Sequence, residues 1–166
     1  MPVNIEKYLL TPGPLTTSKL TKEAMLRDVG SWDSDFKKIT SEIREKLVNI
    51  LMQTSNINKI KNSDPYISIP MQGSGTFSVE AMLGTFVPKT NKALVLSNGS
   101  YGKRCSTILN YLGRENDIID MGDFLPPDPE LLEKKLGQDP YISHVIVIHC
   151  ETSSGILNPI KTISKI

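Results

Sequence analysis

The segment Gln72-Gly73-Ser74-Gly75-Thr76 has the residue types that bind an anion at the start of a helix. Small residues let the backbone approach an anion closely, and the hydroxyl groups of Ser74 and Thr76 can donate hydrogen bonds. Apolar residues at helical spacing follow from Phe77 to Phe86, and the first N–H groups of a helix are unpaired and carry partial positive charge. The segment therefore predicts a site for a phosphorylated ligand, although a tight turn before a helix is often rich in glycine and serine for its geometry alone. It is neither a Walker A loop nor a GxGxxG motif.

Two further polar clusters, Ser97 to Gly102 and His149 to Gly155, each follow an apolar segment that is typical of a buried strand. Parallel sheets bind ligands at the carboxyl ends of their strands, so we expect these clusters to share one site with the glycine turn. Tyr101 could stack on a planar ring there, or could simply be a packing residue.

The cluster from His149 to Gly155 leaves two interpretations open. Glu151, Thr152 and Ser153 could bond to the substituents of a ring, or could cap the next helix. Asn158-Pro159 fits the pattern of an N-cap followed by a first helical residue. The three clusters together suit a flat phosphorylated heterocycle, such as pyridoxal phosphate, a nucleotide or flavin mononucleotide.

Alternating strand and helix patterns predict an α/β fold with a mainly parallel sheet that helices flank on both faces. A stripe of apolar residues at helical spacing, Phe36, Ile39, Ile43, Leu47, Ile50 and Leu51, indicates the most clearly marked helix. Besides the segment after the glycine turn, the expected helices are Ser18 to about Asp28, Ser34 to about Thr54, Ser100 to Leu112 and Asp128 to Leu136. The expected strands are Tyr66 to Met71, Ala93 to Leu96, Asp117 to Asp120 and Val145 to Ile148, with a loop from Asn56 to Pro65.

Composition narrows the class of protein. The chain has 166 residues, 39% hydrophobic and 22% charged, which is a globular balance for one ordinary domain. A net charge of +1 gives no basic footprint for nucleic acid. We find no apolar run of about 20 residues and no signal peptide, so we expect a cytoplasmic protein without a membrane span. Cys105, Cys150, His144 and His149 lack metal spacing, so we expect no metal and two packed, reduced thiols.

Five motifs taken together resemble the class V, fold type I aminotransferases, which depend on pyridoxal 5′-phosphate. Within that family, Ser31-Trp32-Asp33 and His149-Cys150-Glu151-Thr152 favour the aminoethylphosphonate branch. The motifs are Leu10-Thr11-Pro12-Gly13-Pro14, Ser31-Trp32-Asp33-Ser34-Asp35-Phe36, Gln72-Gly73-Ser74-Gly75-Thr76, Ser97-Asn98-Gly99-Ser100-Tyr101-Gly102, and His149-Cys150-Glu151-Thr152-Ser153-Ser154-Gly155 with Asn158-Pro159.

The resemblance implies a domain plan and a set of site residues. Residues 1–20 would form an N-terminal arm and residues 21–166 the first part of the cofactor-binding large domain, without its remainder or the C-terminal small domain. Trp32 would lie near the active site or the dimer interface. The cofactor phosphate would be held by Ser74, Gly75 and Thr76, the pyridine ring stacked on Tyr101, its phenolic oxygen bonded by Thr152, and the substrate entrance lined by Gly13.

The resemblance also implies a reaction. Members of this branch transfer the amino group of 2-aminoethylphosphonate to pyruvate, giving phosphonoacetaldehyde and L-alanine in phosphonate catabolism, and work as homodimers. Their Schiff-base lysine and the aspartate that pairs with the pyridine nitrogen lie beyond the position of Ile166. Lys103, Lys161 and Lys165 match no Schiff-base motif, so no catalytic residue is assigned. We therefore expect a fragment that is inactive alone and poorly soluble.

Three alternatives remain open. The chain could be related to a class V enzyme that uses glyoxylate, such as serine or alanine aminotransferase. It could be a noncatalytic α/β module that binds a phosphorylated ligand. It could also be a structural or regulatory remnant that dimerises with a complete paralogue.

Overall fold

The computed structural model describes residues 8–10, 13–54 and 66–166, and these form two compact units, residues 1–72 and 73–166. The expected loop from Asn56 to Pro65 and the Thr11-Pro12 part of the arm lie outside the described residues.

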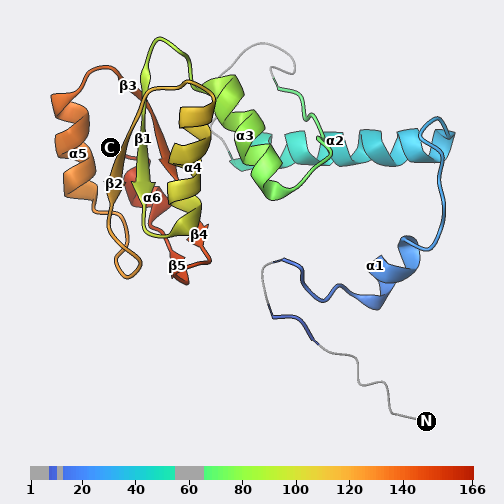
Figure 1. The fold of residues 1–166 in the computed structure, drawn as a ribbon. Helices are drawn as coiled ribbons and strands as arrows, with labels where there is room; N and C mark the ends of the chain where they lie inside the picture. Colours follow the sequence, from blue (N-terminus) through green and yellow to red (C-terminus); the bar gives the residue numbers. More distant parts are fainter. Residues whose placement is uncertain (1–7, 11–12, 55–65) are drawn as a thin grey trace. The chain divides into compact units, whose positions relative to one another are not determined.

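The described residues of the first unit form two helices, α1 (Lys19–Ala24) and α2 (Ser34–Thr54) (Figure 1). The bounds of α2 agree with the prediction, and its apolar stripe is 37–58% exposed. By contrast, α1 ends several residues earlier than expected. Ser18 caps its start by accepting a hydrogen bond from the Thr21 N–H, but α1 buries no residue, so no packing supports further turns.

The expected strand from Tyr66 to Met71 is wrong, because these described residues form no regular structure. Ile67 and Ile69 are about 70% exposed, and no neighbouring strand pairs with them among the described residues. A short apolar run without a pairing partner leaves its backbone groups to solvent, which gives an isolated strand little stability.

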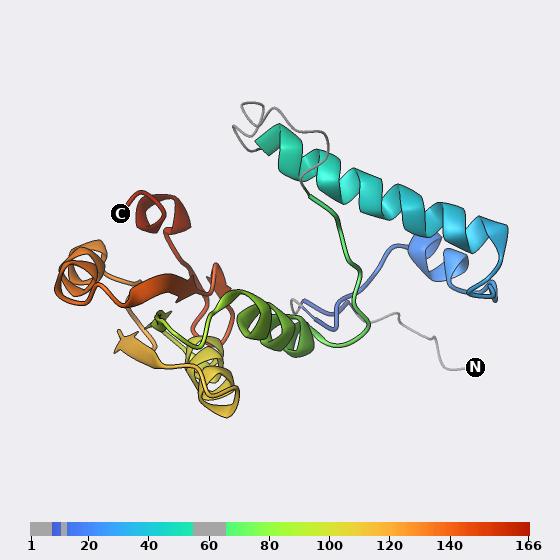
Figure 2. The ribbon, with the colours of Figure 1, turned by 90° about the horizontal axis from the view of Figure 1, so that it is seen from above.

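The second unit is built on a parallel sheet with the strand order β2-β1-β3. Figures 1 and 2 show α3 and α4 on one side of this sheet and α5 and α6 on the other. This confirms the α/β class and the mainly parallel sheet flanked by helices. The elements in chain order are α3 (Gly75–Phe86), β1 (Lys92–Ser97), α4 (Ser100–Tyr111), β2 (Asn116–Asp120), α5 (Pro129–Gln138), β3 (Ile142–Val147), β4 (Cys150–Glu151), β5 (Ile156–Leu157) and α6 (Ile160–Ile163).

Strand β1 forms the centre of the core, because alternate side chains serve opposite faces of the sheet. Ala93 and Val95 pack in the cluster with α3 and α4, whereas Leu94 and Leu96 pack in the cluster with α5 and α6. All four side chains are 0–1% exposed. Full burial of each large aliphatic side chain stabilises the fold by about 1.5–3 kcal/mol. This double-sided packing fixes β1, and therefore fixes where the turn after β1 lies.

A cluster of charged side chains joins the N-terminal ends of the three strands. The Nζ atom of Lys92 lies 2.8 Å from Asp139, 3.4 Å from Glu115 and 3.6 Å from Asp117, and Lys135 lies 2.8 Å from Asp117. The hydrogen bond with Asp139 raises the pKa of Lys92 above its usual range and lowers the pKa of Asp139. The pKa of Asp117 is lowered chiefly by its hydrogen bond with Lys135.

Candidate functional site

The glycine turn opens helix α3, as predicted. Ser74 is the N-cap, and its Oγ accepts a hydrogen bond of 3.2 Å from the Phe77 N–H. Gly73 has a φ of 144°, and a Cβ at this position would lie 2.6 Å from the Phe77 ring, so only glycine fits there. The N–H groups of Gly75 and Thr76 make no hydrogen bond with any described residue, and they therefore remain available to an anion.

The turn from β1 to α4 brings Tyr101 to the same end of the second unit. Ser97 and Asn98 are buried at the end of β1, and Gly99 leads into α4. A Cβ on Gly99 would lie 2.5 Å from the side chain of Glu151, so the close approach of these two segments requires glycine. Tyr101 lies in the first turn of α4 and is 40% exposed. An aromatic side chain held in this way can present its ring to a ligand.

Glu151 is fully buried, and its carboxyl group closes the N-terminus of α4. Its Oε2 accepts hydrogen bonds from the Tyr101 N–H at 3.1 Å and the Gly102 N–H at 3.0 Å. Its Oε1 accepts one from the Ser153 hydroxyl, whose Oγ in turn accepts the Ser100 N–H at 2.9 Å. A carboxylate is stabilised at a helix N-terminus. Of the two roles left open for this cluster, capping applies to Glu151, but the helix that it caps is the earlier one.

Asn158 does not act as the N-cap of the last helix, so that prediction is wrong. The N-cap of α6 is Pro159, which has no side-chain capping bond. Instead the buried amide of Asn158 exchanges two hydrogen bonds of 2.9 Å with Asn98 and donates one of 2.7 Å to the Ile148 carbonyl. A buried amide needs such partners. The pair ties the end of β1 to the segment after the antiparallel β4–β5 hairpin, a hairpin that the strand patterns did not predict.

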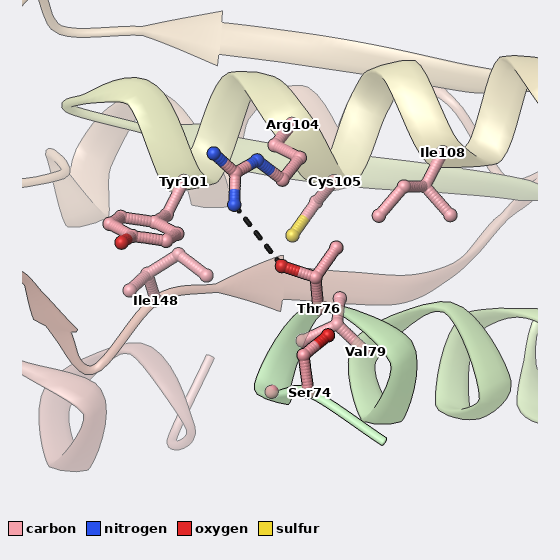
Figure 3. Close-up of a pocket in the computed structure, with 9 residues that line it drawn as sticks. Ser74, Thr76, Val79, Tyr101, Arg104, Cys105, Ile108 and Ile148 are labelled. Carbon is pink, nitrogen blue, oxygen red and sulfur yellow. Dashed lines mark hydrogen bonds between the residues drawn. The ribbon is translucent and has the colours of Figure 1, made fainter. Parts of the chain in front are cut away.

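A cavity of about 360 Å³ lies between the starts of α3 and α4 (Figure 3). Its volume is in the range of small-molecule sites. It brings together four of the predicted site residues, Ser74, Gly75, Thr76 and Tyr101. Thr152 is exposed and is not among the described residues that line the cavity, and Gly13 belongs to the first unit. The remaining lining residues are Val79, Arg104, Cys105, Ile108 and Ile148.

Arg104 was missed by the sequence reasoning, although a signal for it was present. Tyr101, Arg104, Cys105 and Ile108 recur at the i, i+3, i+4 and i+7 spacing that places side chains on one face of a helix. Once Tyr101 is a candidate, its helical neighbours become candidates too. The Nη1 of Arg104 donates a hydrogen bond of 3.2 Å to Thr76 Oγ1, which crosses the cavity from α4 to α3 (Figure 3).

The two cysteines differ. Cys105 is buried as expected, and its burial raises the pKa of the thiol, with a further rise from the nearby Glu151 charge that Arg104 opposes. Cys150 is exposed, so the expectation that it is packed is wrong: in the two-residue strand β4 it is Glu151, the other residue, whose side chain points inward. His144 is partly buried and His149 is exposed.

No group of three or more His, Cys, Asp and Glu side chains in the described part of the chain could hold a metal ion. None of the helices in the described ranges is both long enough and apolar enough to cross a membrane.

The donors at the cavity suit the phosphate of pyridoxal phosphate. Gly75 and Thr76, with their unpaired N–H groups, line it together with Arg104, whose guanidinium meets the Thr76 hydroxyl (Figure 3). Tyr101 and the aliphatic lining provide the apolar surface that a pyridine ring needs. The residues present therefore fit the two chemically different parts of this cofactor.

Comparison with curated proteins gives close relatives. The chain is 54% identical over 160 residues to a 2-aminoethylphosphonate–pyruvate transaminase of Rhizobium meliloti, covering 96% of this chain and 40% of that protein. It is 46% identical over 158 residues to the transaminase of the same name from Pseudomonas aeruginosa, covering 95% and 40%. The chain thus spans about two fifths of the length of these relatives. No family model matches it.

Solved structures with the same fold are aminotransferases at lower identity. A pyridoxamine–pyruvate aminotransferase from Mesorhizobium loti matches with a TM-score of 0.79 at 22% identity, over 96% of this chain and 38% of that chain. An aspartate aminotransferase from Thermus thermophilus matches with a TM-score of 0.78 at 21% identity, over 96% and 41%. The resemblance seen in the sequence motifs is therefore confirmed: this chain is a relative of the 2-aminoethylphosphonate–pyruvate transaminases and corresponds to part of their length, with the fold of the matching part of an aminotransferase.

Proposed function

We propose that this chain forms the cofactor-binding part of a pyridoxal-phosphate-dependent transaminase that converts 2-aminoethylphosphonate and pyruvate to phosphonoacetaldehyde and L-alanine. The observation that carries the proposal is the 54% identity, along 96% of the chain, to a protein named for these two substrates. The cavity supports the proposal, because groups that can bind an anion and an aromatic ring line the same cavity, whose volume of about 360 Å³ suits one small ligand.

The residues of the second unit take distinct parts in this proposal. The N–H groups of Gly75 and Thr76 and the hydroxyls of Ser74 and Thr76 hold the phosphate. Tyr101 packs against the ring and excludes water from one of its faces. When bound, the cofactor supplies the carbonyl and amine chemistry through which an amino group passes from donor to acceptor. Thr152 bonds the phenolic oxygen of the ring; it follows Glu151 directly, and the buried Glu151 anchors the start of that loop.

Gly13 also has a part in this proposal. Gly13 lines the substrate entrance within an N-terminal arm of residues 1–20, and residues 21–166 belong to the cofactor-binding domain. The lysine that forms the Schiff base and the aspartate that pairs with the pyridine nitrogen are assigned to no residue of this chain. The protein acts as a cytoplasmic homodimer in phosphonate catabolism.

Cofactor binding by the 166-residue chain is the first test. Pyridoxal phosphate forms adducts with exposed lysines through its aldehyde, so pyridoxamine 5′-phosphate, which has no aldehyde, is the better probe. Isothermal titration should show saturable binding of this compound and weaker binding of pyridoxamine, which lacks the phosphate. Binding of AMP without binding of pyridoxamine 5′-phosphate would contradict the proposal and favour a nucleotide-binding module.

Substrate choice is tested with the protein that the complete coding region specifies. Alanine formation from pyruvate should require 2-aminoethylphosphonate as the donor and should fail with serine. Turnover of serine or alanine with glyoxylate, without turnover of 2-aminoethylphosphonate, would instead place the protein with the glyoxylate-dependent aminotransferases.

A further inference from the structure

Arg104 carries the only charged side chain among the described residues that line the cavity. It reaches across from α4 to donate a 3.2 Å hydrogen bond to Thr76 Oγ1 at the start of α3. Its guanidinium also lies over the Tyr101 ring, 4.9 Å from the centroid, which is within the range of a cation–π contact. One side chain therefore touches a residue of the predicted phosphate site and the residue of the predicted ring site (Figure 3).

The charge of Arg104 is left without a carboxylate partner, in contrast to that of the preceding residue. Lys103 lies 3.3 Å from Asp120 and 3.7 Å from Asp123 and is thus compensated. Arg104 forms no ion pair with any residue that the structure describes. An uncompensated guanidinium beside two open N–H groups makes this end of the cavity favourable for a dianion such as a phosphate monoester.

The other helix that starts at the cavity, α4, already has its own anion. The Glu151 carboxyl group accepts the N–H groups of Tyr101 and Gly102 and fills the N-terminus of α4. A second anion placed there would meet an occupied site and a like charge. A phosphate is therefore directed to the start of α3, on the side where Arg104 lies.

The hydrogen bond from Arg104 also orients a second donor. Thr76 Oγ1 accepts the guanidinium N–H, and its hydroxyl hydrogen is then turned away from Arg104 and is free to donate. Arg104 acts on a bound anion directly through its charge and indirectly through Thr76.

We propose that Arg104 binds the phosphate group of the cofactor and, by packing on Tyr101, couples recognition of the phosphate to the position of the ring. This inference rests on the proposed function of the same cavity. Its expected signature is selective: loss of Arg104 weakens a ligand that has the phosphate far more than the same ligand without it.

The test compares pyridoxamine 5′-phosphate with pyridoxamine in four forms of the full chain: wild type, Arg104→Met, Arg104→Lys and Lys103→Met. Arg104→Met should weaken binding of the phosphorylated probe by about tenfold or more, the loss typical of one charge-assisted hydrogen bond, and weaken binding of pyridoxamine far less. The affinity of Arg104→Lys for the phosphorylated probe should lie between those of wild type and Arg104→Met, since lysine keeps the charge but lacks the planar guanidinium group. Lys103→Met, which removes the same charge one residue away, should bind like wild type.

Each result has a definite meaning. Failure of the wild-type chain to bind the phosphorylated probe overturns the proposed function and the role of Arg104 together. Wild-type binding that Arg104→Met and Arg104→Lys leave unchanged overturns the role of Arg104 alone. Equal weakening of both probes in Arg104→Met also overturns it, because Arg104 would then only support the Tyr101 ring. The test compares the affinities for pyridoxamine 5′-phosphate and pyridoxamine within each variant. A less stable variant has a smaller folded fraction, which lowers both apparent affinities by the same factor and leaves their ratio unchanged.

Discussion

The charged side chains at the two ends of the parallel sheet differ in whether they are paired with opposite charges. At the N-terminal ends of the strands, Lys92 is surrounded by Asp139, Glu115 and Asp117, and its side chain is only 18% exposed. At the C-terminal ends, Arg104 lines a cavity and has no acidic partner in the described part of the chain, and Gly75 and Thr76, whose N–H groups are unpaired, line the same cavity. The first end is electrostatically complete, whereas the second is built to receive an anion.

Glu151 makes this difference possible, because the C-terminal end does hold a buried carboxyl group. That group is bound to backbone N–H groups of α4 and to Ser153 and makes no ion pair with Arg104 or with any other described residue. The start of α4 therefore satisfies this carboxyl group with hydrogen bonds, and the guanidinium is not paired with it. The carboxyl group of Glu151, which lies in β4, caps the first turn of α4, and Arg104 lies in α4 close to that turn. The two charges have different partners, because Glu151 bonds N–H groups of α4 and Arg104 bonds Thr76.

The largest effect on the C-terminal end should come from Glu151→Ala. This change removes a fully buried carboxyl group and leaves the N–H groups of Tyr101 and Gly102 without acceptors. We expect a loss of about 3 kcal/mol in the free energy of unfolding, measured by urea denaturation with far-ultraviolet circular dichroism. Glu151→Gln retains one acceptor oxygen and should lose less. An unchanged urea midpoint for Glu151→Ala would mean that α4 does not depend on this cap.

The next effect concerns the ligand. Thr76→Ala removes the hydroxyl that Arg104 orients and should weaken binding of pyridoxamine 5′-phosphate by about tenfold, which corresponds to about 1.4 kcal/mol. The backbone N–H of residue 76 is unaffected, so α3 should stay folded. Thr76→Ser keeps the hydroxyl and serves as the matched control, with affinity near that of wild type. Equal affinity for the alanine variant and wild type would remove this hydroxyl from the proposed phosphate site.

How much of this arrangement can be predicted from the sequence depends on whether the cause is local. The helix start at Ser74 and the buried strand β1 follow from patterns of a few neighbouring residues, and both agree with the structure. Tyr66 to Met71 has the same kind of apolar pattern but no pairing partner in the described chain, so the pattern alone was misleading. Strand pairing is a property of distant segments.

The partners of Glu151 and Asn158 were also beyond sequence reasoning. Glu151 bonds residues 49 and 50 positions earlier, and Asn158 pairs with Asn98, 60 positions earlier. The local pattern at both residues is typical of a cap for the following helix, and the fold uses both to tie β1 and α4 to the β4–β5 segment instead. Arg104 is different, since its place on the helical face of Tyr101 could have been found from spacing alone.

A smaller effect is expected at the N-terminal end of the sheet from Lys92→Met. The Lys92 hydrogen bond lowers the pKa of Asp139, and Lys92 contributes to the lowered pKa of Asp117. The two ionised aspartates therefore stabilise the folded state at pH values above the ordinary aspartate pKa of about 3.9. This contribution is lost as the pH falls through the lowered pKa values of the folded state. The thermal midpoint of Lys92→Met should lie below that of wild type at pH 7. The difference should shrink at pH values below about 4.

At alkaline pH the stabilisation from Lys92 itself changes in the opposite direction, since it is lost as the pH rises. Its pKa is raised in the folded state, so its contribution is complete below the ordinary lysine value of about 10.4 and is lost only as the pH rises through the raised value. The gap between wild type and Lys92→Met should therefore stay constant from pH 7 to about 10. Lys89→Met, at an exposed lysine three residues earlier, should show no gap. Binding of pyridoxamine 5′-phosphate should be the same in all three proteins, because Lys92 is at the far end of the strands.

The smallest effect is expected from Lys103→Met. Its partners Asp120 and Asp123 are 40% and 61% exposed, and exposed ion pairs contribute about 0.5 kcal/mol or less. The variant carries the same net charge as Arg104→Met, so any long-range effect of charge on an anionic ligand should appear equally in both. If Lys103→Met weakened binding of the phosphorylated probe as much as Arg104→Met does, the effect would come from the general positive charge near the cavity and not from a specific contact of Arg104. A loss confined to Arg104→Met would place selectivity in the one guanidinium that bridges α4 and α3.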